Sequence, residues 1–236
     1  MDKHKFDRII NEALSDADLE SSEIPAIDLY VDQIVNLVSE KIKQGSPLFY
    51  DRHLTKTMIN NYSKDGVIAP VKGKKYTREQ IVQILLIYSL KNTLSINEIK
   101  RVLNGAYSTT GFDADVLSAL YDYYLKIKKE NREDCRASIE NFIRENNLDV
   151  TDEIDYITLL FSVVSLSTFF QNIAHALVDA KYPAQPEELY EKSRKKDREK
   201  DRDKNRTVEK EQNTLESDSD SDDIDISDFE EGKARS

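Results

Sequence analysis

A single stretch, from Leu54 to Leu103, restricts the fold more than any other part of the sequence. Apolar residues at helical spacing alternate in it with glycine-containing breaks. The first helical pattern has one apolar face, formed by Leu54, Met58, Ile59 and Tyr62. Asp65-Gly66 ends this pattern, because glycine tolerates the left-handed conformation that follows a helix C-terminus. The stretch therefore predicts a helix over about 54–64 and a turn after it.

A short basic hairpin is expected next. Val67–Val71 and Lys74–Tyr76 are two extended runs on either side of Lys72-Gly73. Lysines 72, 74 and 75 cluster at the tip, where they repel one another and gain from a negative partner such as phosphate. The segment 71–76 thus predicts a two-stranded wing.

Two further helices complete the stretch. Thr77 with Gln80 and Ser95 with Glu98 both have the spacing of a capping box, in which each residue of the pair bonds the other's backbone N–H. A strongly apolar run follows the first box, and Gly105 is expected just beyond the helix that the second box opens.

The helix over 54–64 presents a polar face suited to DNA. We expect Thr57, Asn60 and Asn61 to face base edges in the major groove, since asparagine pairs with adenine and threonine offers a hydroxyl and a methyl group. The expected phosphate contacts come from six cations: Lys56, Lys64, Lys72, Lys74, Lys75 and Arg78. An ordinary solvated helix face is the alternative interpretation.

The order of these parts resembles the winged helix-turn-helix domain of the MerR family of bacterial transcription regulators. The resemblance lies in TMINNYSKDGVIAP (57–70), in the wing GKKY (73–76) and in LSINEI (94–99), and IPAIDLYVDQI (24–34) further resembles an uncharacterised bacterial family of MerR-like proteins with a domain of unknown function. It covers about residues 24–104 and implies a DNA-binding regulator. Two features depart from the MerR pattern: Asn60 and Asn61 stand where an Arg and a Tyr are typical, and the long heptad dimerisation helix is missing.

Charge is distributed unevenly along the chain. The net charge is −11, yet residues 52–103 hold 10 Lys and Arg against 3 Asp and Glu. Nucleic-acid binding depends on such a local patch more than on the total charge. Double-stranded DNA therefore stays a compatible partner.

The sequence predicts a mostly α-helical protein: a MerR-like winged helix-turn-helix with a short two-stranded wing, followed by a C-terminal helical lobe. Residues 1–23 form an amphipathic segment, 24–104 the DNA-binding domain, 105–184 the helical lobe, and 185–236 a mixed-charge and then acidic disordered tail. Within the second part, an apolar stripe from Pro25 to Lys43 predicts a helix with its cap at Asp28 or a neighbour. The tail's default role is solubility, and competition with DNA for the lysine wing is the sharper hypothesis.

An uncharged segment of 23 residues, 156–178, is long enough to span a bilayer. Polar residues recur along it every three or four positions, which favours a buried helix at a homodimer interface over a membrane span. The expected interface residues are Leu159, Phe161, Val163, Leu166, Phe169 and Phe170.

No pattern points to catalysis, a cofactor or a metal. The three histidines are scattered, the single Cys135 excludes a clustered thiolate site, and there is no phosphate-binding glycine loop. The opening MDKHKFDR lacks the apolar core of a signal peptide. We expect a cytoplasmic, homodimeric transcription regulator that is not an enzyme; the alternative is a helical interaction or scaffold module that no longer binds DNA.

Overall fold

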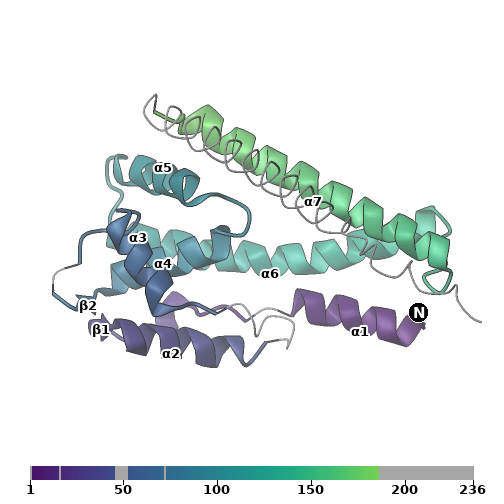
Figure 1. The fold of residues 1–236 in the computed structure, drawn as a ribbon, viewed down its shortest axis with the longest axis horizontal. Coiled ribbons are helices and arrows are strands. Elements are labelled where there is room, and N and C mark those ends of the chain that lie inside the picture. Colours follow the sequence, from purple (N-terminus) through teal and green to yellow (C-terminus); the bar gives the residue numbers. More distant parts are fainter. Residues whose placement is uncertain (1, 16, 46–52, 72, 186–236) are drawn as a thin grey trace, which may run out of the picture. The chain divides into compact units, whose positions relative to one another are not determined.

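The protein is described by a computed structural model covering residues 2–15, 17–45, 53–71 and 73–185, and the account below concerns the unit Met1–Pro183. As predicted, it is mostly helical, with one small antiparallel sheet (Figure 1). The helices are α1 (Lys3–Leu14), α2 (Val31–Ile42), α3 (Lys56–Lys64), α4 (Arg78–Leu90), α5 (Ile96–Tyr107), α6 (Ala114–Glu145) and α7 (Glu153–Lys181), with a 3-10 turn, η1, at Ser21–Glu23.

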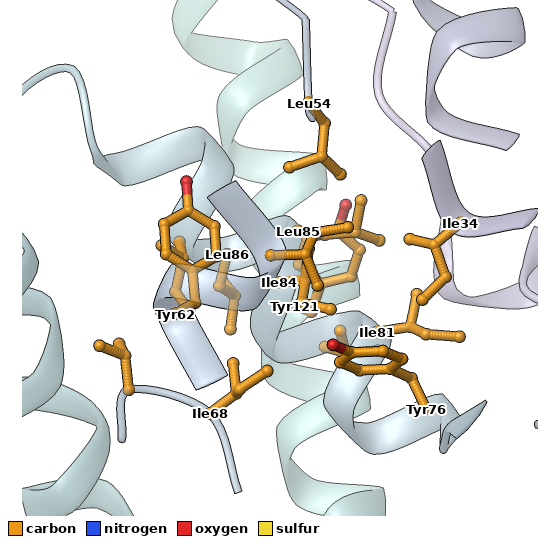
Figure 2. Close-up of a cluster of buried hydrophobic side chains, with 14 of the residues drawn as sticks. Ile34, Leu54, Tyr62, Ile68, Tyr76, Ile81, Ile84, Leu85, Leu86 and Tyr121 are labelled. Carbon is orange, nitrogen blue, oxygen red and sulfur yellow. The ribbon is translucent and has the colours of Figure 1, made fainter. Parts of the chain in front are cut away.

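Helix α4 is the centre of the core. All eight residues from Gln80 to Ile87 are buried, so the helix is enclosed on every side. Figure 2 shows its side chains surrounded by residues from α2, α3, α6 and the segments between them. The labelled partners are Ile34, Leu54, Tyr62, Ile68, Tyr76 and Tyr121. The predicted capping box at Thr77 and Gln80 starts α4, which confirms that signal.

Helix α2 begins close to the position that the sequence predicted. Its N-cap was expected at Asp28 or a neighbour and is Tyr30, because Leu29–Tyr30 are extended as strand β1 and Val31 is the first helical residue. The side chains of Ile34 and Val38 then bury one face of α2 against the core. The tertiary pairing of β1 overrides the local helical pattern.

The two-stranded sheet is not the predicted hairpin. Strand β2 (Lys75–Tyr76) pairs antiparallel with β1, in the register Leu29 to Tyr76 and Tyr30 to Lys75. The run Val67–Val71, expected to be the other strand of the wing, is not a strand. Val67 and Ile68 are buried in the main core instead, so burial takes precedence over ladder pairing there.

Helix α5 begins at the predicted capping box of Ser95 and Glu98 but ends later than expected. Gly105 was placed beyond its end, whereas the helix continues to Tyr107. A Cβ atom at position 105 would lie 2.2 Å from a ring carbon of Tyr182. Gly105 therefore permits a close approach between α5 and the end of α7, and it does not terminate the helix.

Helices α6 and α7 form a long pair joined near Val150, where a second cluster unites Phe6, Val150 and Leu159. From there the two helices diverge toward α5 (Figure 1). Of the six expected interface residues on α7, Leu159 is buried in this cluster, which corrects its assignment. The other five are exposed: Phe161, Val163, Leu166, Phe169 and Phe170.

Polar contacts fix the C-terminal third of α7 to α5. His175 Nδ1 lies 2.7 Å from Glu98 Oε1, and Arg101 Nη2 lies 2.8 Å from Asp179 Oδ1. Burial raises the pKa of Glu98, but hydrogen bonds from the Ser95 hydroxyl and N–H and from His175 outweigh it and lower that pKa to about 2. The ionised Glu98 carboxylate therefore stabilises the folded protein.

This arrangement predicts a pH-dependent effect of Glu98→Gln. Because the folded pKa lies below the ordinary value of 4.5, the carboxylate's contribution is complete above pH 4.5 and is lost as the pH falls toward 2. At pH 7 we expect the free energy of unfolding to drop by about 1–3 kcal/mol. Denaturant titrations between pH 7 and 2.5 measure the difference from wild type, which should shrink below pH 4.5.

Glu40→Gln, on an exposed position of α2, is the matched control. It should change the unfolding free energy by less than about 0.5 kcal/mol at every pH. A difference for Glu98→Gln that stays constant down to pH 2.5 would contradict the role given to the carboxylate.

Candidate nucleic-acid interface

Helix α3 separates its two faces as the sequence predicted. Thr55 caps it by accepting a hydrogen bond from the N–H of Met58 at 3.2 Å. Ile59 and Tyr62 are buried in the main core, and burial raises the pKa of the Tyr62 hydroxyl. The three expected base-reading residues, Thr57, Asn60 and Asn61, are all exposed. Their side chains are thus accessible to a ligand in solution.

A shallow depression of about 640 Å³ connects α3 with the turn before β2. Asn60 and Lys64 line it from α3, and Gly73 and Lys74 line it from the turn. Tyr30 and Asp32 contribute from the start of α2. The polar helix face and the lysine-bearing turn are therefore adjacent, although they are separated in sequence.

The lysines of the turn differ in their surroundings. Lys74 is exposed. Lys75 is also exposed and holds its ammonium 5.1 Å from the ring centroid of Tyr30, a cation–π contact across the two-stranded sheet. Lys72 lies outside the described residues. The sheet thus fixes the backbone that carries this turn.

Two of the expected phosphate contacts already have partners within the protein. Lys56 forms an ion pair with Asp32, and both side chains are more than half exposed. Arg78 donates from Nη2 to the carbonyl oxygen of Ser21 at 2.8 Å, which holds η1 against the start of α4. Lys56 can exchange the Asp32 carboxylate for a phosphate, whereas Arg78 would have to break its hydrogen bond to Ser21 in order to contact one.

The segment between α3 and β2 is held by two buried glutamines of α4. Gln80 Nε2 donates to the carbonyl oxygens of Ala69 and Pro70, both at 3.0 Å. Gln83 Oε1 accepts from the N–H of Ala69 at 3.0 Å. Together they satisfy the backbone of a segment that no strand pairs, and so position the turn beside α3.

A further hydrogen-bond chain extends this support to α5. Gln83 Nε2 donates to the hydroxyl of Tyr107 at 2.5 Å, and that hydroxyl donates to Glu79 Oε1 at 2.7 Å. Burial and the neighbouring Glu79 carboxylate both raise the pKa of Tyr107. The tyrosine therefore stays protonated and keeps its donor role.

The sequence interpretation missed Asp32, Tyr30 and Gln83, and it gave Gln80 a capping role only. A signal for the glutamines was present: Gln83 interrupts a run that is apolar on all sides, and an enclosed helix buries whatever polar group it carries. No comparable signal marked Asp32 or Tyr30, because their proximity to the site depends on how β1 pairs.

In the described part of the chain, no group of three or more His, Cys, Asp or Glu side chains is arranged to hold a metal ion. Cys135 is free and exposed on α6.

Comparison with known proteins identifies one domain. A domain of unknown function, DUF1836, spans residues 19–124. No curated protein and no solved structure matches the chain. The matched range begins at Leu19 and includes η1, both strands, α2–α5 and the first part of α6, so the whole α3 surface lies inside it, while α1 and α7 lie outside.

The role of Gln80 is testable by Gln80→Met, which keeps the side chain's approximate shape but removes its hydrogen bonds. The carbonyls of Ala69 and Pro70 and the N–H of Thr77 would lose their partner. We expect the free energy of unfolding to fall by about 1–3 kcal/mol, measured by chemical denaturation. Asn60→Ala, at an exposed position, should stay within about 0.5 kcal/mol of wild type; equal effects of the two would argue against the anchoring role.

Proposed function

We propose that this protein is a DNA-binding transcription regulator of the cytoplasm, on a MerR-like winged helix-turn-helix. In this proposal α3 enters the major groove, where Thr57, Asn60 and Asn61 contact base edges. Lys56, Lys64, Lys74 and Lys75, with Lys72 from outside the described residues, contact phosphates. The observation that supports it most is that the exposed α3 face and the lysine-bearing turn border one depression.

The dimensions of α3 fit this role. An α-helix with its side chains is about 10–12 Å in diameter, which fits the width of about 12 Å of the major groove, and the nine residues of α3 extend for about 13 Å. A rigid mounting is also needed for base readout, and α3 is fixed by the fully buried Ile59 and by Tyr62. The helix is short, exposed on one side and rigidly supported on the other.

Electrostatics supports the same proposal. Residues 52–103 carry a net charge of +7 in a chain of net charge −11, so attraction for a polyanion concentrates on this region. Phosphate contacts position a protein on DNA, while the amide groups of Asn60 and Asn61 would distinguish bases. Affinity and sequence preference would therefore come from different residues.

The lysine turn gives the first test. Binding of the full chain to genomic DNA fragments, measured by gel shift, should weaken about 500-fold for a fourfold rise in salt if all five phosphate contacts form. Replacing Lys74 and Lys75 together by alanine should lower the log–log salt slope by about 2 and weaken all sequences alike. Asn60→Ala should leave that slope unchanged and reduce the preference of the protein for its tightest-binding fragment over the other fragments.

A matched control separates the local surface from total charge. Replacing Lys126 and Lys129 together by alanine removes the same charge from exposed positions of α6. That variant should bind DNA like wild type. Equal weakening by the two double variants would indicate non-specific attraction and count against an interface at α3.

The ion pair of Lys56 gives a second test. Asp32 lines the depression and neutralises Lys56, so it opposes the approach of a phosphate. Asp32→Asn should tighten DNA binding several-fold at low salt, with a smaller gain at high salt. Asp7→Asn, an exposed change on α1, is the control and should have no effect.

The alternative function is a protein-interaction or scaffold module without DNA binding. The large apolar surface that α7 exposes favours it. If the folded protein gives no gel shift at low salt, the DNA-binding proposal is wrong and this alternative replaces it.

A further inference from the structure

Helix α7 carries an apolar stripe with heptad spacing. Its members recur at alternating intervals of four and three residues, as in the seam of a coiled coil. We name these residues the α7 seam: Val163 (40% exposed), Leu166 (49%), Phe170 (69%), Ile173 (54%) and Leu177 (67%). Leu159 has the same spacing one step earlier, but it is 4% exposed and is covered by the second cluster.

The α7 seam continues a groove between α6 and α7. This groove has a volume of about 530 Å³, and Val163, Leu166 and Phe170 line it from α7. Cys135 and Phe142 line it from α6. The apolar stripe of α7 is more exposed beyond Leu159, where α7 moves away from α6 (Figure 1).

We propose that the α7 seam pairs antiparallel with the α7 seam of a second copy of this chain, seated along the α6–α7 groove. A heptad stripe matches only another helix, because its period keeps one face against a helical partner. An isologous contact also requires a self-complementary surface. With Leu166 opposite the partner's Phe170 and Val163 opposite the partner's Ile173, each apolar residue meets another.

Charge at the ends of α7 favours a second copy in this orientation. The first turn carries Glu153 and Asp155, and the last turn carries Lys181. Antiparallel pairing in the register above brings Lys181 next to the partner's Asp155. A parallel pair would instead place like charges together.

The acidic C-terminal segment of the same chain is a poor occupant. Residues 186–236 contain 30 charged residues among 51, with 18 acidic and 12 basic. Such a composition has too little apolar surface to cover the α7 seam.

A bilayer fits the helix less well than a second copy does. By length and composition α7 is able to cross a membrane. However, Gln171 donates to the carbonyl of Thr93 at 3.3 Å, and His175 and Asp179 bond to Glu98 and Arg101 of α5. The stretch from Tyr156 to Phe170 that remains is about 22 Å long, less than the hydrocarbon thickness of about 30 Å.

This pairing does not depend on DNA binding and refines the interface expected from sequence. Around the helix axis Phe161 lies about 180° from Phe170, on the side that carries most of the polar residues. Phe169 also falls outside the heptad spacing. Both were expected at the interface. In the proposed pairing they do not belong to the α7 seam.

Two phenylalanines with the same exposure provide the test. Phe170 (69% exposed) is in the α7 seam and Phe161 (68%) is not. Sedimentation equilibrium of the full chain should show a wild-type dimer. Phe170→Asp should raise the dimer dissociation constant by about 30-fold or more, and Phe161→Asp should leave it nearly unchanged. Circular dichroism checks that both variants are folded.

The single cysteine supplies a second measurement that needs no variant. Cys135 lines the groove and is exposed in one copy, so a seated partner would shield its thiol. Its reaction rate with a thiol reagent should rise when the wild-type protein is diluted through its dimer dissociation range.

Four results would overturn the pairing. They are a monomeric wild type at high micromolar concentration, equal dissociation by the Phe161 and Phe170 variants, a Cys135 rate independent of protein concentration, and flotation of a monomeric protein with phosphatidylcholine–phosphatidylglycerol vesicles. A gel shift is a separate observable, so failure here and failure of the DNA-binding proposal are distinguishable.

Discussion

Complete burial of the central two turns of α4, Gln80–Ile87, is the constraint on which the rest of this structure depends. A helix enclosed on every side needs neighbours in all directions, and α2, α3, α6 and the segment after α3 supply them. The apolar faces of these elements are used up in covering it. Their polar faces therefore remain outside, and the exposed side of α3 results from the same packing that gives the protein its core.

Burial of α4 also determines how its polar residues act. Gln80 and Gln83 are enclosed with the apolar residues, so each needs hydrogen-bond partners within the protein. They find them on Ala69, Pro70 and Tyr107. The turn before β2 is thereby tied to the centre of the core, and a surface feature takes its position from a buried interaction.

Helix α7 is held in the structure by a different kind of contact from the one that holds the core helices. Its C-terminal third is fixed by polar contacts to α5, with Glu98 ionised at neutral pH, while most of its apolar residues are exposed. It also lies outside the range of the DUF1836 domain. A surface that the described chain does not cover indicates a role in assembly, separate from the α3 surface.

The sequence by itself determined which segments are helical, where two of the helices begin and which side of α3 is polar. These depend on local rules: capping boxes at Thr77 and Ser95 and the periodicity of apolar residues. Tertiary structure alone decided that β2 pairs with β1, that Gly105 lies inside α5, and that Asp32 neutralises Lys56. The physical reason is distance along the chain. A strand's partner, the ring that approaches a glycine and the counter-ion of a lysine are set by packing among remote segments, which local periodicity does not encode.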